Sequence, residues 1–204
     1  MTDSTYDMII LCLHQRIAIQ MVQEALPKIP TGTILVDTCG LKGRMVRDLT
    51  YRCRKAGVRY VGTHPMAGRE KNGYYASIPN LFQNANLIVT PVDGTDEAAL
   101  DTVKELADQM GFGKIVTATP MWHDNMIAYT SQLAHVVSSS YVKDFCMDDA
   151  LSFSGGSFQD MTRVATMDES MWAALFLDNR DNLLYHLDLL IENLTDYRDA
   201  LKQR

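Results

Sequence analysis

Short apolar runs alternate with amphipathic stretches through the first part of this 204-residue chain, up to about Ala118. The first run, residues 8–13, is continuously apolar, which is typical of a parallel strand buried on both faces. Apolar runs predict strands at 8–13, 33–37, 59–64, 86–90 and 114–118. Amphipathic stretches between them predict helices at 17–26, 42–56 and 95–111, the last capped by Thr95. Strands that alternate with helices indicate an α/β fold with a mostly parallel sheet.

The strand pattern stops at Pro120. From there the sequence has helical periodicity, apart from a glycine-rich break at residues 154–157. We therefore predict a truncated, Rossmann-like parallel sheet domain over residues 1–119 and an all-helical domain over residues 120–204.

The last predicted helix carries an apolar seam with the spacing 4-3-4-3-4. Its members are Leu183, Leu187, Leu190, Leu194, Tyr197 and Leu201. This spacing is typical of two helices that pack along their length. The partner helix belongs either to the same chain or to a second copy, and we predict a homodimer through the C-terminal helices.

The predicted helix at 120–142 has an unusual polar face. At 100° per residue, one face is apolar (Met126, Tyr129, Leu133, Val136, Val137). The opposite stripe holds small and polar residues (Asp124, Ala128, Ser131, His135, Ser138) in place of the usual charges. The stripe indicates a helix that faces either a ligand groove or another helix.

Polar residues follow three predicted strands where those strands end. These residues are His14 after the first strand, Asp37, Thr38, Cys39 and Gly40 after the second, and His64 after the third. In open α/β sheets, ligands bind at the carboxyl ends of the strands. We interpret this edge as a ligand site, with the alternative that Asp37 only caps a helix or closes a turn.

His64 lies in the most informative segment, Gly-Thr-His-Pro-Met-Ala-Gly at residues 62–68. The proline that follows disfavours helix for the histidine and holds it extended, and the flanking glycines permit close backbone approach to a ligand. A histidine at a strand end can exchange a proton near neutral pH. A further segment, Ser-Gly-Gly-Ser-Phe-Gln-Asp-Met-Thr-Arg, contains Gly156 and Arg163, and arginine presents a planar fork suited to a carboxylate.

Composition narrows the class of function. The net charge is −6, and Lys and Arg are scattered along the sequence, so there is no cluster of positive charge that would bind nucleic acid or an anionic membrane. No apolar run approaches the roughly 20 residues that span a bilayer. The four cysteines form no CxxC pair and no metal spacing, so we expect free thiols, a cytoplasmic location and no bound metal.

These motifs together resemble the prephenate/arogenate dehydrogenase family of tyrosine biosynthesis. The matching segments occur in the family's order along nearly the whole chain. They are residues 37–43, 62–68 followed by Glu70, Gly73, Leu81 and Phe82, 123–124, 131–135, 160–165, and 171–172 followed by Asn179. The resemblance implies a Rossmann-like domain joined to an all-helical dimerisation domain, with oxidative decarboxylation of prephenate or arogenate by NAD or NADP.

The resemblance also implies roles for the residues found above. His64 would be the general base toward the ring hydroxyl of the substrate, and His135 would line the substrate pocket. Arg163 would pair with a substrate carboxylate. The other substrate contacts would be Ser131, Gln132, Gly156 and Trp172, the last from either the same chain or the partner subunit. Cofactor contacts are expected at His14, Asp37, Thr38, Cys39 and Gly40.

The chain departs from the family pattern at several positions. Gly40 stands where a serine usually supports the catalytic histidine, and Gln132 and Ala134 replace a histidine and a proline. The expected glycine-rich GxGxxG turn is absent from this sequence, so the cofactor pyrophosphate lacks its usual helix N-terminus. Two hypotheses follow: a working dehydrogenase, or a non-catalytic dimeric module that binds an acid of the aromatic pathway.

Overall fold

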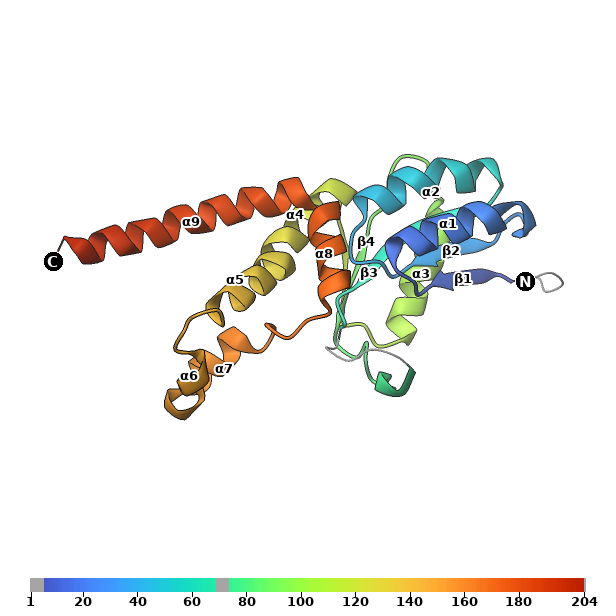
Figure 1. Ribbon diagram of the computed structural model, residues 1–204. Helices are drawn as coiled ribbons and strands as arrows, with labels where there is room; N and C mark the ends of the chain where they lie inside the picture. Colours follow the sequence, from blue (N-terminus) through green and yellow to red (C-terminus); the bar gives the residue numbers. More distant parts are fainter. Residues whose placement is uncertain (1–5, 69–73, 204) are drawn as a thin grey trace. The chain divides into compact units, whose positions relative to one another are not determined.

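A computed structural model describes residues 6–68 and 74–203 of the chain. The chain divides into two compact units, Met1–Asp124 and Asn125–Arg204. The first unit holds a sheet with flanking helices, and the second is helical throughout its regular elements (Figure 1).

The sheet has five strands whose spatial order follows the sequence. They are β1 (Met8–Leu11), β2 (Ile34–Asp37), β3 (Arg59–Pro65), β4 (Asn86–Val89) and β5 (Lys114–Thr117). β1, β2 and β3 are parallel to one another, and β4 is parallel to β5. Among the described strands, only the β3–β4 pair is antiparallel, with Thr63 opposite Val89. The predicted α/β fold with a mostly parallel sheet is therefore confirmed.

The antiparallel pair follows from the connections. Helices α1 (Gln15–Ala25), α2 (Gly43–Lys55) and α3 (Glu97–Gln109) return the chain to the starting edge of the sheet, which makes the next strand parallel. Between β3 and β4 the described residues contain only a short 3₁₀ turn, η2 (Tyr74–Ala76). The chain therefore enters β4 from the end at which it left β3.

Two layers of helices cover the sheet. One core cluster joins β2 and β3 to α1 and α2, with Leu35, Met45 and Leu49 fully buried. The other joins the opposite sheet face to α3 through residues such as Val61 and Val103. Figure 1 shows α1 and α2 on one side of the sheet and α3 on the other. All four residues of β2 are buried. The expectation that the 8–13 run is buried on both faces is wrong, because β1 lies at an edge of the sheet and Ile10 is 45% exposed.

The N-terminus of α3 differs from the sequence prediction by one residue. Asp96, and not Thr95, is the N-cap, because its carboxylate accepts a hydrogen bond from the backbone N–H of Ala99 at 2.8 Å. The Thr95 hydroxyl instead accepts from the N–H of Val92 and closes the preceding turn. Both side chains satisfy loop or helix-end donors, which is why sequence alone does not separate them.

Gly62 is explained by packing inside the protein. A Cβ at this position would lie 2.7 Å from the Thr90 hydroxyl and 3.1 Å from a methyl of Val46. The expectation that this glycine opens the backbone to a ligand is therefore wrong for Gly62. Gly68, at the other end of the motif, has no described atom within 4 Å of its Cβ direction.

The helical unit begins within one long helical run that starts at α4 (Pro120–Ile127). A π-helical turn, η3 (Ala128–Gln132), interrupts the run before α5 (Leu133–Tyr141). The remaining helices are α6 (Met147–Phe153), α7 (Gly156–Thr162), α8 (Glu169–Asp178) and α9 (Arg180–Lys202). In the described part of the chain, no helix is both long and apolar enough to cross a membrane.

The π turn changes which side of the run is buried. A uniform 100° per residue places Tyr129 on the apolar face and Ala128 on the polar stripe. In the structure Tyr129 is 57% exposed, whereas Ala128 is fully buried and packs with Leu133 and Leu183. The wider turn shifts the angular register of the helix, so a period measured across it assigns these two residues to the wrong faces.

The α9 seam is divided along its length. Leu183 is buried, and Leu187 and Leu190 pack against the cluster around Ala128. Leu194, Tyr197 and Leu201 are exposed.

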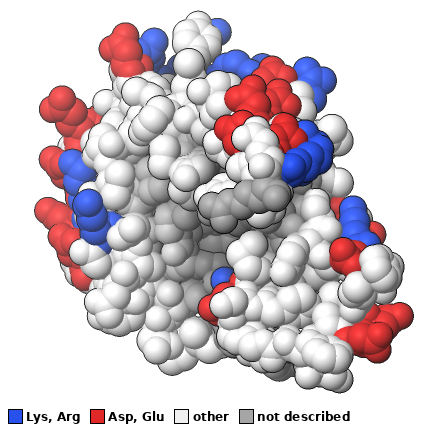
Figure 2. Space-filling model, turned by 90° about the vertical axis from the view of Figure 1, so that its left-hand side faces the viewer, with Lys and Arg blue, Asp and Glu red and all other residues white. Residues whose placement is uncertain are grey.

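On the face drawn in Figure 2, acidic and basic side chains lie interspersed.

Candidate active site

The candidate site of the first unit is built around His64, near the end of β3. Thr63 and His64 pair with Val89 and Ile88 of β4 on one side. On the other side, the Thr63 hydroxyl donates to the Asp37 carbonyl at 2.5 Å, at the end of β2. The pairing on both sides of β3 fixes the backbone that carries His64.

A buried ion pair lies beneath this backbone. Asp37 and Lys42 are both fully buried, and the Lys42 ammonium donates to an Asp37 carboxylate oxygen. The ammonium also donates to the Thr63 carbonyl at 2.5 Å, directly before His64. Tyr60 donates its hydroxyl to the other Asp37 oxygen at 2.7 Å, and the Cys39 N–H donates to the first oxygen at 2.9 Å. Burial and the Asp37 charge raise the pKa of Tyr60 well above its usual value, so the phenol remains a donor.

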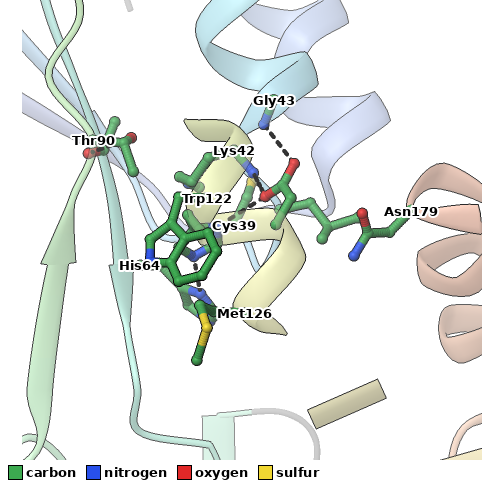
Figure 3. Close-up of polar contacts among 12 residues, drawn as sticks. Cys39, Lys42, Gly43, His64, Thr90, Trp122, Met126 and Asn179 are labelled. Atoms are coloured by element: carbon green, nitrogen blue, oxygen red, sulfur yellow. Dashed lines mark hydrogen bonds and ion pairs between the residues drawn. The ribbon is translucent and has the colours of Figure 1, made fainter. Parts of the chain in front are cut away.

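His64 is joined to a second histidine and a carboxylate. Its Nδ1 lies 2.9 Å from Nε2 of His123, and Nδ1 of His123 lies 2.7 Å from a carboxylate oxygen of Asp124. The Asp124 carboxylate in turn accepts from the backbone N–H of Lys42 at 2.7 Å and of Gly43 at 2.8 Å, where α2 begins. Figure 3 shows the bond from the Gly43 nitrogen to this carboxylate.

The partners of the two histidines determine where their protons lie. A carboxylate only accepts hydrogen bonds, so Nδ1 of His123 carries a proton. In the neutral ring, Nε2 of His123 is then an acceptor, which requires the proton of His64 to be on Nδ1. Nε2 of His64 is therefore a bare acceptor, and it has no hydrogen-bond partner among the described residues.

His64 is neutral over the physiological range of pH. Burial, the nearby His123 and the Lys42 charge, in that order, lower the pKa of His64 from 6.5 to about 3. The ring can thus accept a proton at Nε2. Its surroundings, however, oppose a lasting positive charge on His64 itself.

The residues expected to contact a cofactor fall into two groups. Asp37 and Cys39 are buried and bonded internally, and burial and the Asp37 charge raise the pKa of the Cys39 thiol to about 12. His14 is exposed at the start of α1, while Thr38 and Gly40 are partly exposed beyond β2. Direct contacts from this edge are thus available from His14, Thr38 and Gly40.

Two observations at the same edge fit a nicotinamide group. No described atom lies within 4 Å of the Cβ direction of Gly40, which leaves open space beside the strand end. The side-chain oxygen of Gln15 is buried without a hydrogen-bond partner among the described residues. A carboxamide N–H is a donor of the kind this oxygen lacks.

The helical unit brings together a second set of predicted residues. Nδ1 of His135 donates to the Val164 carbonyl at 3.0 Å, and its ring lies against Trp172 with ring centres 3.6 Å apart. Arg163 precedes Val164 as the C-cap of α7, and its side chain is exposed. His135 and Trp172 therefore meet within one chain.

The other predicted substrate contacts lie in the same unit. Ser131 is in the π turn, and Gly156 is the exposed first residue of α7. Gln132 is buried, with its N–H₂ donating to the Leu175 carbonyl at 3.0 Å and its oxygen accepting from Asn179 at 2.8 Å. The Gln132 amide thus joins η3 to the α8–α9 junction. Glu70 and Gly73 lie outside the described residues.

Sequence reasoning placed Lys42 and His123 in segments that match the family but assigned neither of them a role in the site. The available signals were a lysine five residues after a strand-end aspartate and a His-Asp pair in the first turns of a helix. Within the described ranges, no group of three or more His, Cys, Asp and Glu side chains could hold a metal ion.

Comparison with known families covers nearly the whole chain. Residues 2–117 match the family model described as prephenate dehydrogenase, nucleotide-binding domain. Residues 119–204 match the model described as prephenate dehydrogenase, dimerization domain.

Individual relatives agree with these matches. The chain is 32% identical to a cyclohexadienyl dehydrogenase of Zymomonas mobilis over 96% of its own length and 68% of that protein. It is 30% identical to a prephenate dehydrogenase of Bacillus subtilis, covering 83% of this chain and 47% of that protein. The structure matches prephenate dehydrogenase from Aquifex aeolicus in complex with hydroxyphenyl propionate and NAD+, with a TM-score of 0.84 and 27% identity. That match covers 98% of this chain and 71% of the other.

Proposed function

This chain belongs to the prephenate dehydrogenase family of oxidoreductases, and from that premise we propose that it oxidises prephenate or arogenate with NAD or NADP. The reaction would be an oxidative decarboxylation that yields 4-hydroxyphenylpyruvate or tyrosine. The chain spans about half the length of the Bacillus relative and 68% of the Zymomonas relative. The site described above is the basis for proposing this activity.

The bare Nε2 of His64 carries this proposal. In the reaction, the ring hydroxyl of the substrate loses its proton as its carbon loses hydride, and the ring carboxylate leaves as CO2. Bound NAD or NADP supplies the hydride acceptor. His64 is a base of the required type, because its Nδ1 is engaged by His123 and its Nε2 is left as an acceptor.

We also propose substrate contacts among the residues of the helical unit. Arg163 offers a fork for a carboxylate, and His135 and Trp172 form an aromatic pair suited to a six-membered ring. We further propose Ser131 and Gly156 as substrate contacts, and an indirect role for Gln132 through the internal bonds that hold η3.

Cofactor contacts would come from the edge formed by the ends of β1 and β2. His14, Thr38 and Gly40 are accessible there, and the unpaired Gln15 oxygen would receive a carboxamide N–H. Asp37 and Cys39 would act behind this edge, because the first is buried in the Lys42 ion pair and the second donates its thiol to the Leu13 carbonyl.

The experiment that tests this function is a turnover assay combined with calorimetry. We expect prephenate-dependent reduction of NAD or NADP, followed by the absorbance of the reduced nicotinamide, with 4-hydroxyphenylpyruvate as the product. Arogenate is tested in parallel, with tyrosine as the product. Prephenate binding in the calorimeter without turnover and without cofactor binding would contradict the enzyme and support a binding module.

The exposed residues at the C-terminal end of the α9 seam would form the dimer interface. We propose a homodimer in which Leu194, Tyr197 and Leu201, exposed in one chain, are covered by a second copy. Leu194→Glu places a charge in that apolar contact and is expected to raise the dimer Kd by about two orders of magnitude. Sedimentation of the variant measures the effect. Asn193→Glu adds the same charge beside the seam and should leave Kd nearly unchanged; equal effects would contradict the proposed interface.

A further inference from the structure

The geometry points to a proton relay in which His64 passes its Nδ1 proton to His123 as its Nε2 accepts a proton from the substrate hydroxyl, with Asp124 as the counter-charge of His123. This inference rests on the proposed function, since it concerns the fate of the proton released in that reaction. His64 would be the group that touches substrate. His123 and Asp124 would act through it as positioning and proton-holding residues.

The hydrogen bonds allow the transfer without movement of the three side chains. The substrate O–H bond breaks as a proton binds Nε2 of His64. The proton on Nδ1 of His64 then leaves that nitrogen and binds Nε2 of His123, 2.9 Å away. The result is a neutral His64 and a His123 imidazolium whose Nδ1–H still faces Asp124 at 2.7 Å. Both states use the same two hydrogen bonds.

The surrounding charges favour the proton on His123. His64 lies close enough to the Lys42 ammonium for that charge to oppose a second positive charge on its ring. The Asp37 carboxylate is committed to Lys42 and Tyr60. His123, by contrast, is in direct contact with the Asp124 carboxylate, and its side chain is fully buried. A positive charge on His123 therefore meets an opposite charge in a site of low polarity.

Helix α2 holds the carboxylate in place. Asp124 accepts the backbone N–H groups of Lys42 and Gly43, at the positive end of a 13-residue helix. A Cβ on residue 43 would lie 2.8 Å from Oδ2 of Asp124, so the glycine permits this approach. The counter-charge for His123 is thus preorganised before the proton arrives.

The charge of Asp124 is the first feature to test. Asp124→Asn in the full chain is expected to lower kcat for prephenate by about 10- to 100-fold, with KM changed by less than about threefold. Asp101→Asn, which neutralises an exposed carboxylate paired with Lys104, is the matched control and should change neither quantity.

A second variant perturbs the relay without changing any of its three residues. Gly43→Ala should push the Asp124 carboxylate off the N-terminus of α2 and lower kcat in the same direction, by less than Asp124→Asn. Nitrogen NMR of the labelled imidazoles adds a readout that needs neither cofactor nor turnover. The wild-type chain should show neutral His64 protonated on Nδ1, and Asp124→Asn should lose this single tautomer.

The outcomes separate the relay from the proposed function. A wild-type chain that shows the expected tautomers but no turnover would overturn the proposed dehydrogenase and leave the hydrogen-bonded triad established. Turnover by wild type, with kcat unchanged in Asp124→Asn, would overturn the relay. A fall in kcat with intact tautomers would also overturn it, since a purely structural role predicts that result.

Discussion

Replacing His64 by asparagine is expected to lower kcat for prephenate by about 10²–10⁴-fold, the usual contribution of a general base. Asparagine can keep a hydrogen bond to Nε2 of His123 but cannot accept a proton from the substrate. Binding of prephenate, measured by calorimetry, should change by less than about threefold, because the substitution leaves the proposed contact between Arg163 and a substrate carboxylate unchanged. Initial rates of nicotinamide reduction measure the loss of turnover.

His186→Asn is the matched control for this substitution. His186 is an imidazole of the helical unit whose Nε2 bonds to the Asn125 side chain at 3.1 Å, and no step of the proposed reaction uses it. Its replacement should leave kcat within about twofold, as is usual for substitutions away from a site. A His64→Asn variant that kept more than about a third of wild-type kcat would exclude His64 as the base.

His64→Asn should also change how the free energy of unfolding depends on pH. The pKa of His64 is lowered from 6.5 to about 3 in the native state. Between these values the unfolded chain binds this proton and the native chain does not, so the stability contribution is present above pH 6.5 and is lost as the pH falls toward 3. Urea unfolding at a series of pH values should show a shallower acid decline for His64→Asn. Parallel curves would contradict the lowered pKa.

Lys42→Met is expected to reduce the free energy of unfolding by about 3–5 kcal/mol, the typical effect of breaking a buried ion pair. Among the described residues, the substitution leaves the fully buried Asp37 carboxylate with only Tyr60 and the Cys39 N–H as partners. It also removes the donor to the Thr63 carbonyl beside His64. Urea denaturation of the purified chain measures the loss.

Two further variants show whether the loss comes from the unpaired charge. Adding Asp37→Asn to Lys42→Met should recover part of the stability, since the neutral amide costs less to bury than a lone carboxylate. Lys104→Met breaks an exposed pair with Asp101 and should cost less than about 1 kcal/mol. A double variant as unstable as the sum of the two single variants would contradict the ion-pair account.

Much of the fold can be predicted from local sequence patterns. Apolar runs and turn residues are read a few positions at a time, so the strand at 59–64 and the helix at 42–56 agree with β3 and α2 to within one residue. The seam of α9 is likewise set by local spacing. The motif around His64 and the His-Asp pair at 123–124 sufficed to indicate the family, because family motifs are stretches of consecutive residues.

These local patterns do not predict interactions between residues that are far apart in the sequence. Sequence alone does not show that β4 runs antiparallel to β3, because strand direction depends on the path of the connection. It does not show the π turn at Ala128, because a hydrophobic period assumes one constant turn width. Nor does it separate Asp96 from Thr95 as the cap of α3, since both residues have suitable side chains.

The site itself divides in the same way. The sequence by itself determined that His64 follows a strand and that Asp37 ends the one before it, because strand ends are local features. Only the tertiary structure decided that Lys42 pairs with Asp37 and that His123 meets His64 across 59 positions of chain. Such contacts depend on how sheet, loop and helix pack in three dimensions, and burial then changes the charge that each group can hold.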